Sequence, residues 1–245
     1  MSDPIYLLVD AGNTRIKWGV FDGTDIVKTG AIPTADAALL HAEWGGTVAP
    51  KHMVASNVAG DSVEAHLEHT CENARMTLRM VRSEAEQLGV VNGYRDPAQL
   101  GSDRWAALIA AHHGGKGHKL VVNVGTALTI DALAEGGRFL GGLIVPGPAL
   151  MRRSLDRATA GLRLTEGALH DFPESTPDAI TSGAIQACVG AIVRMHEVMA
   201  AQGMAPRQVI LSGGAAAELA PHLPLAPALR ENLVLEGLAL VARAT

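Results

Sequence analysis

The sequence predicts an α/β protein made of two duplicated domains, each with a mixed sheet flanked by helices. The main observation is an internal repeat, because LLVDAGNTRIKWGVFDG from Leu7 aligns without a gap with LVVNVGTALTIDALAEG from Leu120. The second is the order of elements, in which further strands and helices follow each pair of antiparallel strands. The third is composition: 48% of the 245 residues are apolar and 18% are charged, which indicates a compact globular protein.

The stretch IYLLVDAGNTRIKWGVFDG opens the chain as a hairpin with a polar bend. An apolar run ends at Asp10, and Gly12, Asn13 and Thr14 form the bend. A carboxylate, a glycine that admits close approach of backbone N–H groups and two small polar side chains are suited to hold phosphate and a hydrated cation. Lys17 adds a positive charge. An ordinary hairpin is the alternative, because Gly and Asn are favoured in turns of any protein.

The repeat argues against chance, since it places equivalent residues at two turns. Asp10 aligns with Asn123, and Asn13 aligns with Thr126. One such turn opens each half of the chain. We therefore expect duplicated domains that face each other across a nucleotide cleft.

The first half continues with elements in a recognisable order. Turn residues and hydrophobic periodicity predict a strand over Asp25–Ala31, a helix capped by Thr34 and Asp36 that reaches Trp44 and ends at Gly45-Gly46, a central strand over Lys51–Val58, a helix over Asp61–Asn73 and a strand over Met76–Val81. Antiparallel strands followed by helix, strand, helix and strand are the order of the ribonuclease H-like fold.

The segment GVVNGYRDPAQLGSDRWAALIAAHH has turn signals and then an amphipathic helix, so Asp103 lies near a helix amino terminus. The plain interpretation is a helix cap, in which Ser102 or Asp103 contributes roughly 1 kcal/mol of stability without any chemistry. Gly114 to His118 form the expected linker. The predicted domains are therefore residues 1–115 and 118–245.

The second half begins with the repeated hairpin. After it we expect a strand over Arg138–Val145, a rigid Pro146-Gly147-Pro148 turn into a helix near Ala149, an irregular segment over Leu155–Phe172, a long helix over Ala179–Gln202 capped by the Ser175-Thr176-Pro177-Asp178 segment, a strand over Gln208–Leu211 that enters Ser212-Gly213-Gly214, and a final helix over Asn232–Arg243. Local evidence favours a packing turn at Pro-Gly-Pro over an anion-binding helix start, whereas the glycine pair is as consistent with packing as with ligand binding.

Composition also limits the kinds of partner. The net charge of −5 without a dense basic run argues against a nucleic-acid surface. Cys71 and Cys188 have no metal-ligand spacing, which indicates free thiols in a reducing compartment. We expect no membrane association, because no stretch approaches the ~20 apolar residues needed to cross a bilayer. The expected location is the cytoplasm.

Six motifs in this order resemble those of type III pantothenate kinases over nearly the whole chain: DAGNTRIK at Asp10, GSDRWAAL at Gly101, NVGTALTID at Asn123, GGLIVPGPALMRRSL at Gly141, STPDAITSG at Ser175 and LSGGAA at Leu211. That family belongs to the superfamily of acetate and sugar kinases, chaperone ATPases and actin, which is built from two duplicated ribonuclease H-like domains. The resemblance implies an ATP-dependent phosphotransferase that converts pantothenate to 4'-phosphopantothenate, the first step of coenzyme A biosynthesis.

The resemblance also implies roles for individual residues. Asp10 organises Mg²⁺ and Asp103 is the general base. The nucleotide phosphates contact Asp10, Ala11, Gly12, Asn13, Thr14, Arg15, Ile16 and Lys17 in the first half and Thr126 in the second. Pantothenate contacts Tyr94, Gly101, Ser102, Asp103, Arg104 and Thr176. The family's active site lies at a homodimer interface, so Thr176 is expected to serve the neighbouring subunit's pocket.

One position departs from the family pattern. Most relatives carry an acidic residue where this chain has Asn123, and that carboxylate binds the activating potassium or ammonium ion. An amide oxygen still coordinates but contributes no negative charge, so we expect a weakened monovalent cation site at Asn123.

The alternatives to a pantothenate kinase are another kinase of the superfamily, an actin-like filament protein, or a nucleotide-binding regulator of the Bvg accessory factor type without kinase activity. The presence of both Asp10 and Asp103 argues against an inactive kinase.

Overall fold

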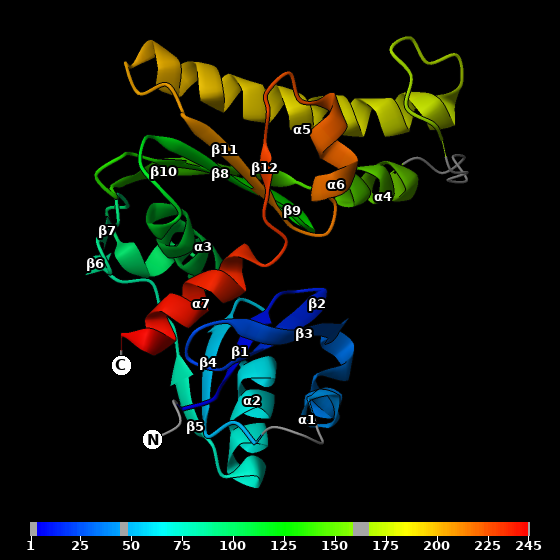
Figure 1. Cartoon of the computed structure of the whole chain (residues 1–245). Helices are drawn as coiled ribbons and strands as arrows, with labels where there is room; N and C mark the ends of the chain where they lie inside the picture. Colours follow the sequence, from blue (N-terminus) through cyan, green and yellow to red (C-terminus); the bar gives the residue numbers. More distant parts are fainter. Residues whose placement is uncertain (1–3, 45–48, 159–166, 245) are drawn as a thin grey trace. The chain divides into compact units, whose positions relative to one another are not determined.

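The protein is described by a computed structural model that covers residues 4–44, 49–158 and 167–244 (Figure 1). It consists of two compact units. Unit 1 contains Met1–Gly115 and Asn232–Thr245, and unit 2 contains Lys116–Glu231. The carboxy-terminal segment therefore differs from the expectation, since the second domain predicted over 118–245 ends at Glu231. The reason is that the last helix, which is rich in buried apolar side chains, packs on strands and a helix of unit 1.

Unit 1 is built on a mixed five-stranded sheet with the strand order β3-β2-β1-β4-β5. Strands β1, β2 and β3 are antiparallel, whereas β1, β4 and β5 are parallel. Its elements are β1 (Tyr6–Ala11), β2 (Arg15–Phe21), β3 (Ile26–Pro33), η1 (Thr34–Leu39), α1 (Leu40–Glu43), β4 (His52–Asn57), α2 (Asp61–Ala74), β5 (Thr77–Met80), β6 (Glu86–Gln87), β7 (Val90–Val91), η2 (Pro97–Gln99), α3 (Ser102–His113) and α7 (Leu233–Arg243).

The central strand β1 is apolar because helices cover both of its faces. On one face, Leu7 and Val9 are fully buried in a cluster with Leu67 of α2. On the other face, helices α7 and α3 pack on β1 and β4. Leu8 lies on this second face, because its cross-strand partner Gly19 is next to Leu235 of α7. Side chains alternate along a strand, so Asp10 shares the face of Leu8 and is directed towards the side that carries α3.

Unit 2 repeats this architecture with the strand order β10-β9-β8-β11-β12. The two orders match strand for strand, which confirms the duplication and the ribonuclease H-like arrangement. Its elements are β8 (Lys119–Val124), β9 (Ala127–Leu133), β10 (Phe139–Pro146), α4 (Pro148–Ala158), α5 (Thr176–Ala201), β11 (Gln208–Ser212), α6 (Ala216–Leu219), η3 (Ala220–His222) and β12 (Ala228–Leu229).

Helix α5 lies along one face of the unit 2 sheet (Figure 1). By length and composition alone it is the one described helix that qualifies as a membrane span, which corrects the expectation that no stretch of the chain comes close. Its side chains Ile185, Cys188 and Ile192 are buried in the core cluster of unit 2. The burial of these side chains accounts for part of the apolar composition of α5.

Two local expectations differ from the structure. Leu155 was expected to begin an irregular segment that ends at Phe172, but α4 continues to Ala158, and residues 159–166 lie outside the described part of the chain. Thr34 and Asp36 were expected to cap a helix, but η1 begins after Pro33 without a side-chain cap. The predicted end of that helix at Gly45-Gly46 also lies outside the described residues.

Candidate active site

Asp10 lies at the end of β1 between two polar neighbours. Antiparallel pairing places it opposite Lys17 of β2, and parallel pairing places it beside Ser56 of β4. Residues in register point to the same face of a sheet, so these three side chains lie on one face. The same arrangement recurs in unit 2, where Asn123 of β8 is paired with Thr129 and Ser212.

The carboxylates of Asp10 and Asp103 are close enough to interact. The pKa of Asp10 is raised to about 7, because burial and, to a smaller extent, the negative charge of Asp103 outweigh the opposing positive charge of Lys17. Burial also raises the pKa of Asp103, against the effect of the Arg104 backbone N–H and guanidinium group. Two carboxylates with raised pKa values near one point are typical of a catalytic or cation-binding site.

Asp103 is held at the start of α3 in a manner that differs from a helix cap. The N-cap residue is Gly101, and no side chain caps the helix. The Oδ1 atom of Asp103 instead accepts a 2.8 Å hydrogen bond from the backbone N–H of Arg104. A Cβ atom at Gly101 would lie 2.6 Å from that Oδ1, so a larger residue there would displace the carboxylate from this position. Asp103 is therefore not the N-cap residue of α3, although its carboxylate accepts a backbone N–H of the first turn.

Ser102 is directed into the protein. Its hydroxyl lies 2.9 Å from the Ser56 hydroxyl and donates a 3.3 Å hydrogen bond to the carbonyl of Asn57. Both serine side chains are buried. These bonds attach the first residue of α3 to β4, the neighbour of the strand that carries Asp10. The geometry thus favours a positioning role for the Ser102 hydroxyl.

Tyr94 and Arg104, predicted as substrate-binding residues, are in contact. The Arg104 Nη1 atom donates a 3.1 Å hydrogen bond to the Tyr94 hydroxyl, and the guanidinium lies 5.7 Å from the ring centroid. Asn92, which sequence reasoning treated only as a turn residue, accepts a 3.0 Å hydrogen bond from the Tyr94 backbone N–H. Its amide group donates to the Ser83 hydroxyl and to the Pro97 carbonyl. Asn92 therefore fixes the backbone that carries Tyr94.

The polar turn of the first hairpin is tight. The Gly12 N–H donates a 3.1 Å hydrogen bond to the Arg15 carbonyl. The three predicted contacts Asn13, Thr14 and Arg15 have exposed side chains. The side chains of Ala11 and Ile16 are fully buried, so these two residues can meet a ligand only through their backbone.

The equivalent turn of unit 2 is assembled from three of the sequence motifs. The Gly147 N–H of the Pro-Gly-Pro turn donates a 2.9 Å hydrogen bond to the Thr126 carbonyl. Gly213, with φ of +97°, packs so closely that a Cβ atom would lie 2.5 Å from both Asn123 Oδ1 and the Val124 carbonyl oxygen. Only glycine suits this position, and it brings those two oxygens to one point.

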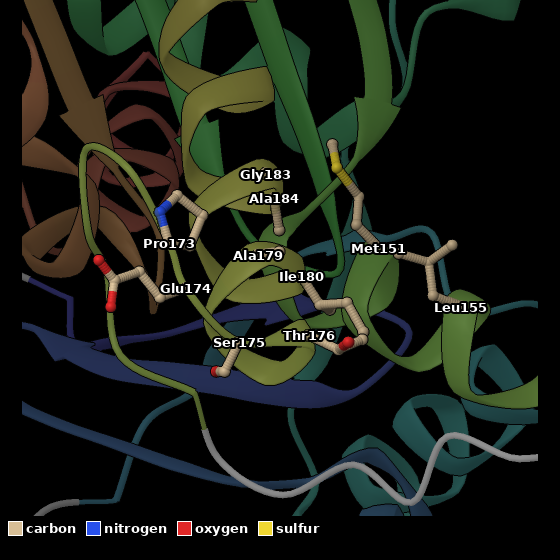
Figure 2. A pocket seen from close by; sticks show the side chains of 10 residues that line it. All are labelled: Met151, Leu155, Pro173, Glu174, Ser175, Thr176, Ala179, Ile180, Gly183 and Ala184. Carbon is tan, nitrogen blue, oxygen red and sulfur yellow. The ribbon is translucent and has the colours of Figure 1, made fainter.

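Thr176 lies in unit 2 on the wall of a pocket of about 650 Å³ (Figure 2). The pocket lies between α4 and the first turns of α5, and its lining is largely apolar: Met151, Leu155, Pro173, Ala179, Ile180 and Ala184, with Glu174, Ser175, Thr176 and Gly183. Ser175 caps α5 by accepting from the Asp178 N–H, as predicted. The exposed Thr176 side chain is therefore presented at a fixed helix start.

Comparison with known proteins places the chain in a family. Residues 6–198 match the family model described as type III pantothenate kinase. The chain belongs to the type III pantothenate kinase family. The type III pantothenate kinase of Nitrosospira multiformis is 43% identical over 243 residues, which cover 99% of this chain and 93% of that protein. The enzyme of Azoarcus sp. is 46% identical over 97% of this chain and 90% of that protein. This pantothenate kinase family member is thus a phosphotransferase with an alcohol acceptor.

Solved structures support the fold of the kinase. A conserved Baf family protein from Campylobacter jejuni has a TM-score of 0.64 at 21% identity and covers 97% of this chain and 98% of its own. The ethanolamine utilization protein EutJ from Carboxydothermus hydrogenoformans has a TM-score of 0.57 at 15% identity, with 98% and 90% covered. At such low identities the likeness concerns the fold alone.

The residues around Asp10 fit a magnesium ion held largely through water. The described residues contain no group of three or more His, Cys, Asp and Glu side chains that could enclose a metal. Mg²⁺ prefers a few carboxylates together with water and substrate phosphates to an all-protein cage. The partly exposed Asp10 carboxylate supplies such a ligand, and a cation there would stabilise the ionised form that burial disfavours.

Proposed function

We propose that the protein transfers the γ-phosphoryl group of ATP to the primary hydroxyl of pantothenate and releases 4'-phosphopantothenate and ADP. The observation that carries the proposal is the pairing of Asp10 with Asp103 in unit 1, in a chain of the pantothenate kinase family. The Asp103 carboxylate accepts the hydroxyl proton as the pantothenate oxygen attacks the γ-phosphorus. Its ordinary pKa is low, and the increase due to burial makes it a stronger base.

The remaining residues hold charge and position, which is most of what phosphoryl transfer requires of a protein. The backbone of the turn Gly12 to Arg15 and the ammonium group of Lys17 bind the phosphates, with Thr126 in unit 2 as a further donor. Asp10 would hold Mg²⁺, largely through water, and the bound ion would neutralise charge on the phosphate oxygens. The Arg104 guanidinium binds the pantothenate carboxylate, and Tyr94 orients it.

An acceptor panel tests the function. Purified protein is mixed with ATP and Mg²⁺ and with pantothenate, acetate, glucose or N-acetylmannosamine, in potassium, ammonium and sodium buffers. Among these acceptors, we expect only pantothenate to cause ADP release. Mass spectrometry should then show a pantothenate product that carries one added phosphoryl group. Nucleotide binding without pantothenate phosphorylation in any buffer would favour the regulatory alternative. Phosphorylation of a sugar or of acetate would indicate another kinase of the superfamily.

We further propose a cytoplasmic homodimer in which Thr176 of one subunit completes the pantothenate site of the other. The exposed Thr176 side chain at the rim of a largely apolar pocket supports a role at an interface. Sedimentation velocity at micromolar concentration should give a dimer. A monomer that retains full activity would contradict this arrangement.

Asn123 leads to a prediction about the monovalent cation. An ion of low charge density is retained by the summed field of its oxygen ligands, and a carboxylate is a large share of that field. At an effective dielectric constant near 20 and about 3 Å, one full charge contributes roughly 5 kcal/mol before dehydration. The two oxygens that meet beside Gly213, Asn123 Oδ1 and the Val124 carbonyl, carry no full charge. We therefore expect weak or no potassium dependence in the wild type and a clear dependence in Asn123→Asp.

The measurement is the initial rate in potassium, ammonium and sodium buffers of equal ionic strength. Asn73→Asp is a matched control, because it adds the same charge on an exposed position of α2. It should leave the cation response unchanged. A strong potassium requirement in the wild type would show that other oxygens complete the cation site.

A further inference from the structure

Thr34 contacts the phosphate turn from a neighbouring element. Its hydroxyl donates a 2.6 Å hydrogen bond to the carbonyl of Gly12. Its backbone N–H donates a 3.0 Å hydrogen bond to the carbonyl of Thr14. One residue of η1 therefore binds two carbonyl groups of the turn, those of Gly12 and Thr14, and it does so instead of capping a helix.

These two bonds determine how the turn presents its N–H groups. In a planar trans peptide the C=O and N–H groups point in opposite directions. Fixing the Gly12 carbonyl therefore fixes the direction of the Asn13 N–H, and fixing the Thr14 carbonyl fixes that of the Arg15 N–H. The bonds also hold two carbonyl oxygens, which would repel a phosphate, against Thr34. A turn fixed in this way is prepared for an anion before the anion arrives.

Thr34 is itself held by its neighbours. Pro33 precedes it at the end of β3, with its ring restricting φ to the observed −58°. Arg15 is paired with Pro33 across β2 and β3, so the sheet brings Thr34 next to the turn. Ala37 and Leu40, which follow in η1 and α1, are buried in the core cluster of unit 1. The hydroxyl thus donates from a rigid base.

We propose that Thr34 is a positioning residue for nucleotide binding, which acts on ATP phosphates through the Gly12–Arg15 turn. The inference rests on the proposed function, because it requires that this turn binds the phosphates. The proposed role of Thr34 concerns the affinity for ATP and not the transfer of a proton to Asp103. Loss of the Thr34 hydroxyl should weaken ATP binding and leave the handling of pantothenate unchanged.

The test compares Thr34→Val, which removes the hydroxyl at nearly constant volume, with Thr34→Ser, which restores it. We expect Thr34→Val to raise the Kd and KM for Mg–ATP about three- to tenfold, the usual effect of one hydrogen bond. The KM for pantothenate should stay within about twofold of the wild-type value, because the turn acts on the ATP phosphates and not on pantothenate. Thr34→Ser should bind ATP like the wild type. Amide hydrogen exchange at residues 12–15 should become faster in Thr34→Val and should stay at the wild-type rate in Thr34→Ser.

Thr77→Val is the matched control, because the Thr77 hydroxyl also joins two segments of unit 1 through a 2.8 Å hydrogen bond to His52 Nδ1. It should leave ATP affinity unchanged. Thr34→Ala removes the same hydroxyl and replaces Thr34→Val if valine prevents folding. Unchanged ATP affinity in both hydroxyl-free variants overturns the inference, and so does an equal loss of ATP and pantothenate binding. If Asp10→Asn also leaves Mg–ATP affinity unchanged, the proposed phosphate site itself is wrong. If Asp10→Asn loses Mg–ATP affinity while the Thr34 variants keep it, only the role of Thr34 is overturned.

Discussion

Asp103→Asn is expected to lower kcat by about 10² or more while both KM values change little, the usual result of losing a general base. Asparagine retains the shape of the side chain and an oxygen that can accept the Arg104 N–H, but it cannot accept a proton from the substrate hydroxyl. Steady-state rates and direct binding of pantothenate and ATP to the variant provide the measurement. Near-normal turnover would remove Asp103 as the base.

The pH profile provides a second readout for Asp103. A general base acts only when it is deprotonated, so wild-type kcat should fall as the pH is lowered through the pKa of Asp103. Burial raises that pKa, so the fall should occur at a higher pH than for an ordinary aspartate. The residual activity of Asp103→Asn should lack this fall. Asp61→Asn is the matched control, since Asp61 also lies in the first turn of a unit 1 helix, and it should keep wild-type kcat.

Asp10→Asn is expected to weaken Mg²⁺-dependent ATP binding by about 10- to 100-fold, the range for groups that hold a metal through its outer ligands. The substitution removes the negative charge and keeps an oxygen. Calorimetric titration with ATP in Mg²⁺ and in EDTA separates the two contributions, and the loss should be confined to the Mg²⁺ titration. Equal weakening in EDTA would mean that Asp10 acts on the nucleotide without the ion.

Thermal stability distinguishes this effect from a folding defect. Burial and the nearby Asp103 raise the pKa of Asp10 to about 7, so the ionised carboxylate is disfavoured in the free protein at neutral pH. A neutral asparagine removes that repulsion. The Tm of ligand-free Asp10→Asn should therefore equal or exceed that of the wild type. Asp25→Asn, an exposed change in the next turn, should alter neither Tm nor Mg–ATP affinity.

The sequence alone determined the duplicated α/β fold and the family. Strand and helix periodicity is local, so the order of β1 to β5 could be read directly, and the repeat at Leu120 fixed the second copy. The motifs at Asp10 and Gly101 also identified candidate residues, because each combines a carboxylate with a glycine two positions away. These features depend on neighbours along the chain.

Only the tertiary structure decided which distant residues meet. Thr34 has a sequence context typical of a helix cap, yet its hydroxyl binds Gly12, 22 positions away. Ser102 belongs to the predicted pantothenate segment, and its hydroxyl meets Ser56 on a strand 46 positions away. Helix α7 belongs to unit 1 although it follows unit 2 in sequence. Hydrophobic periodicity predicts that a side chain is buried, but it does not predict which element covers that side chain. Long-range partners are therefore decided by packing in three dimensions.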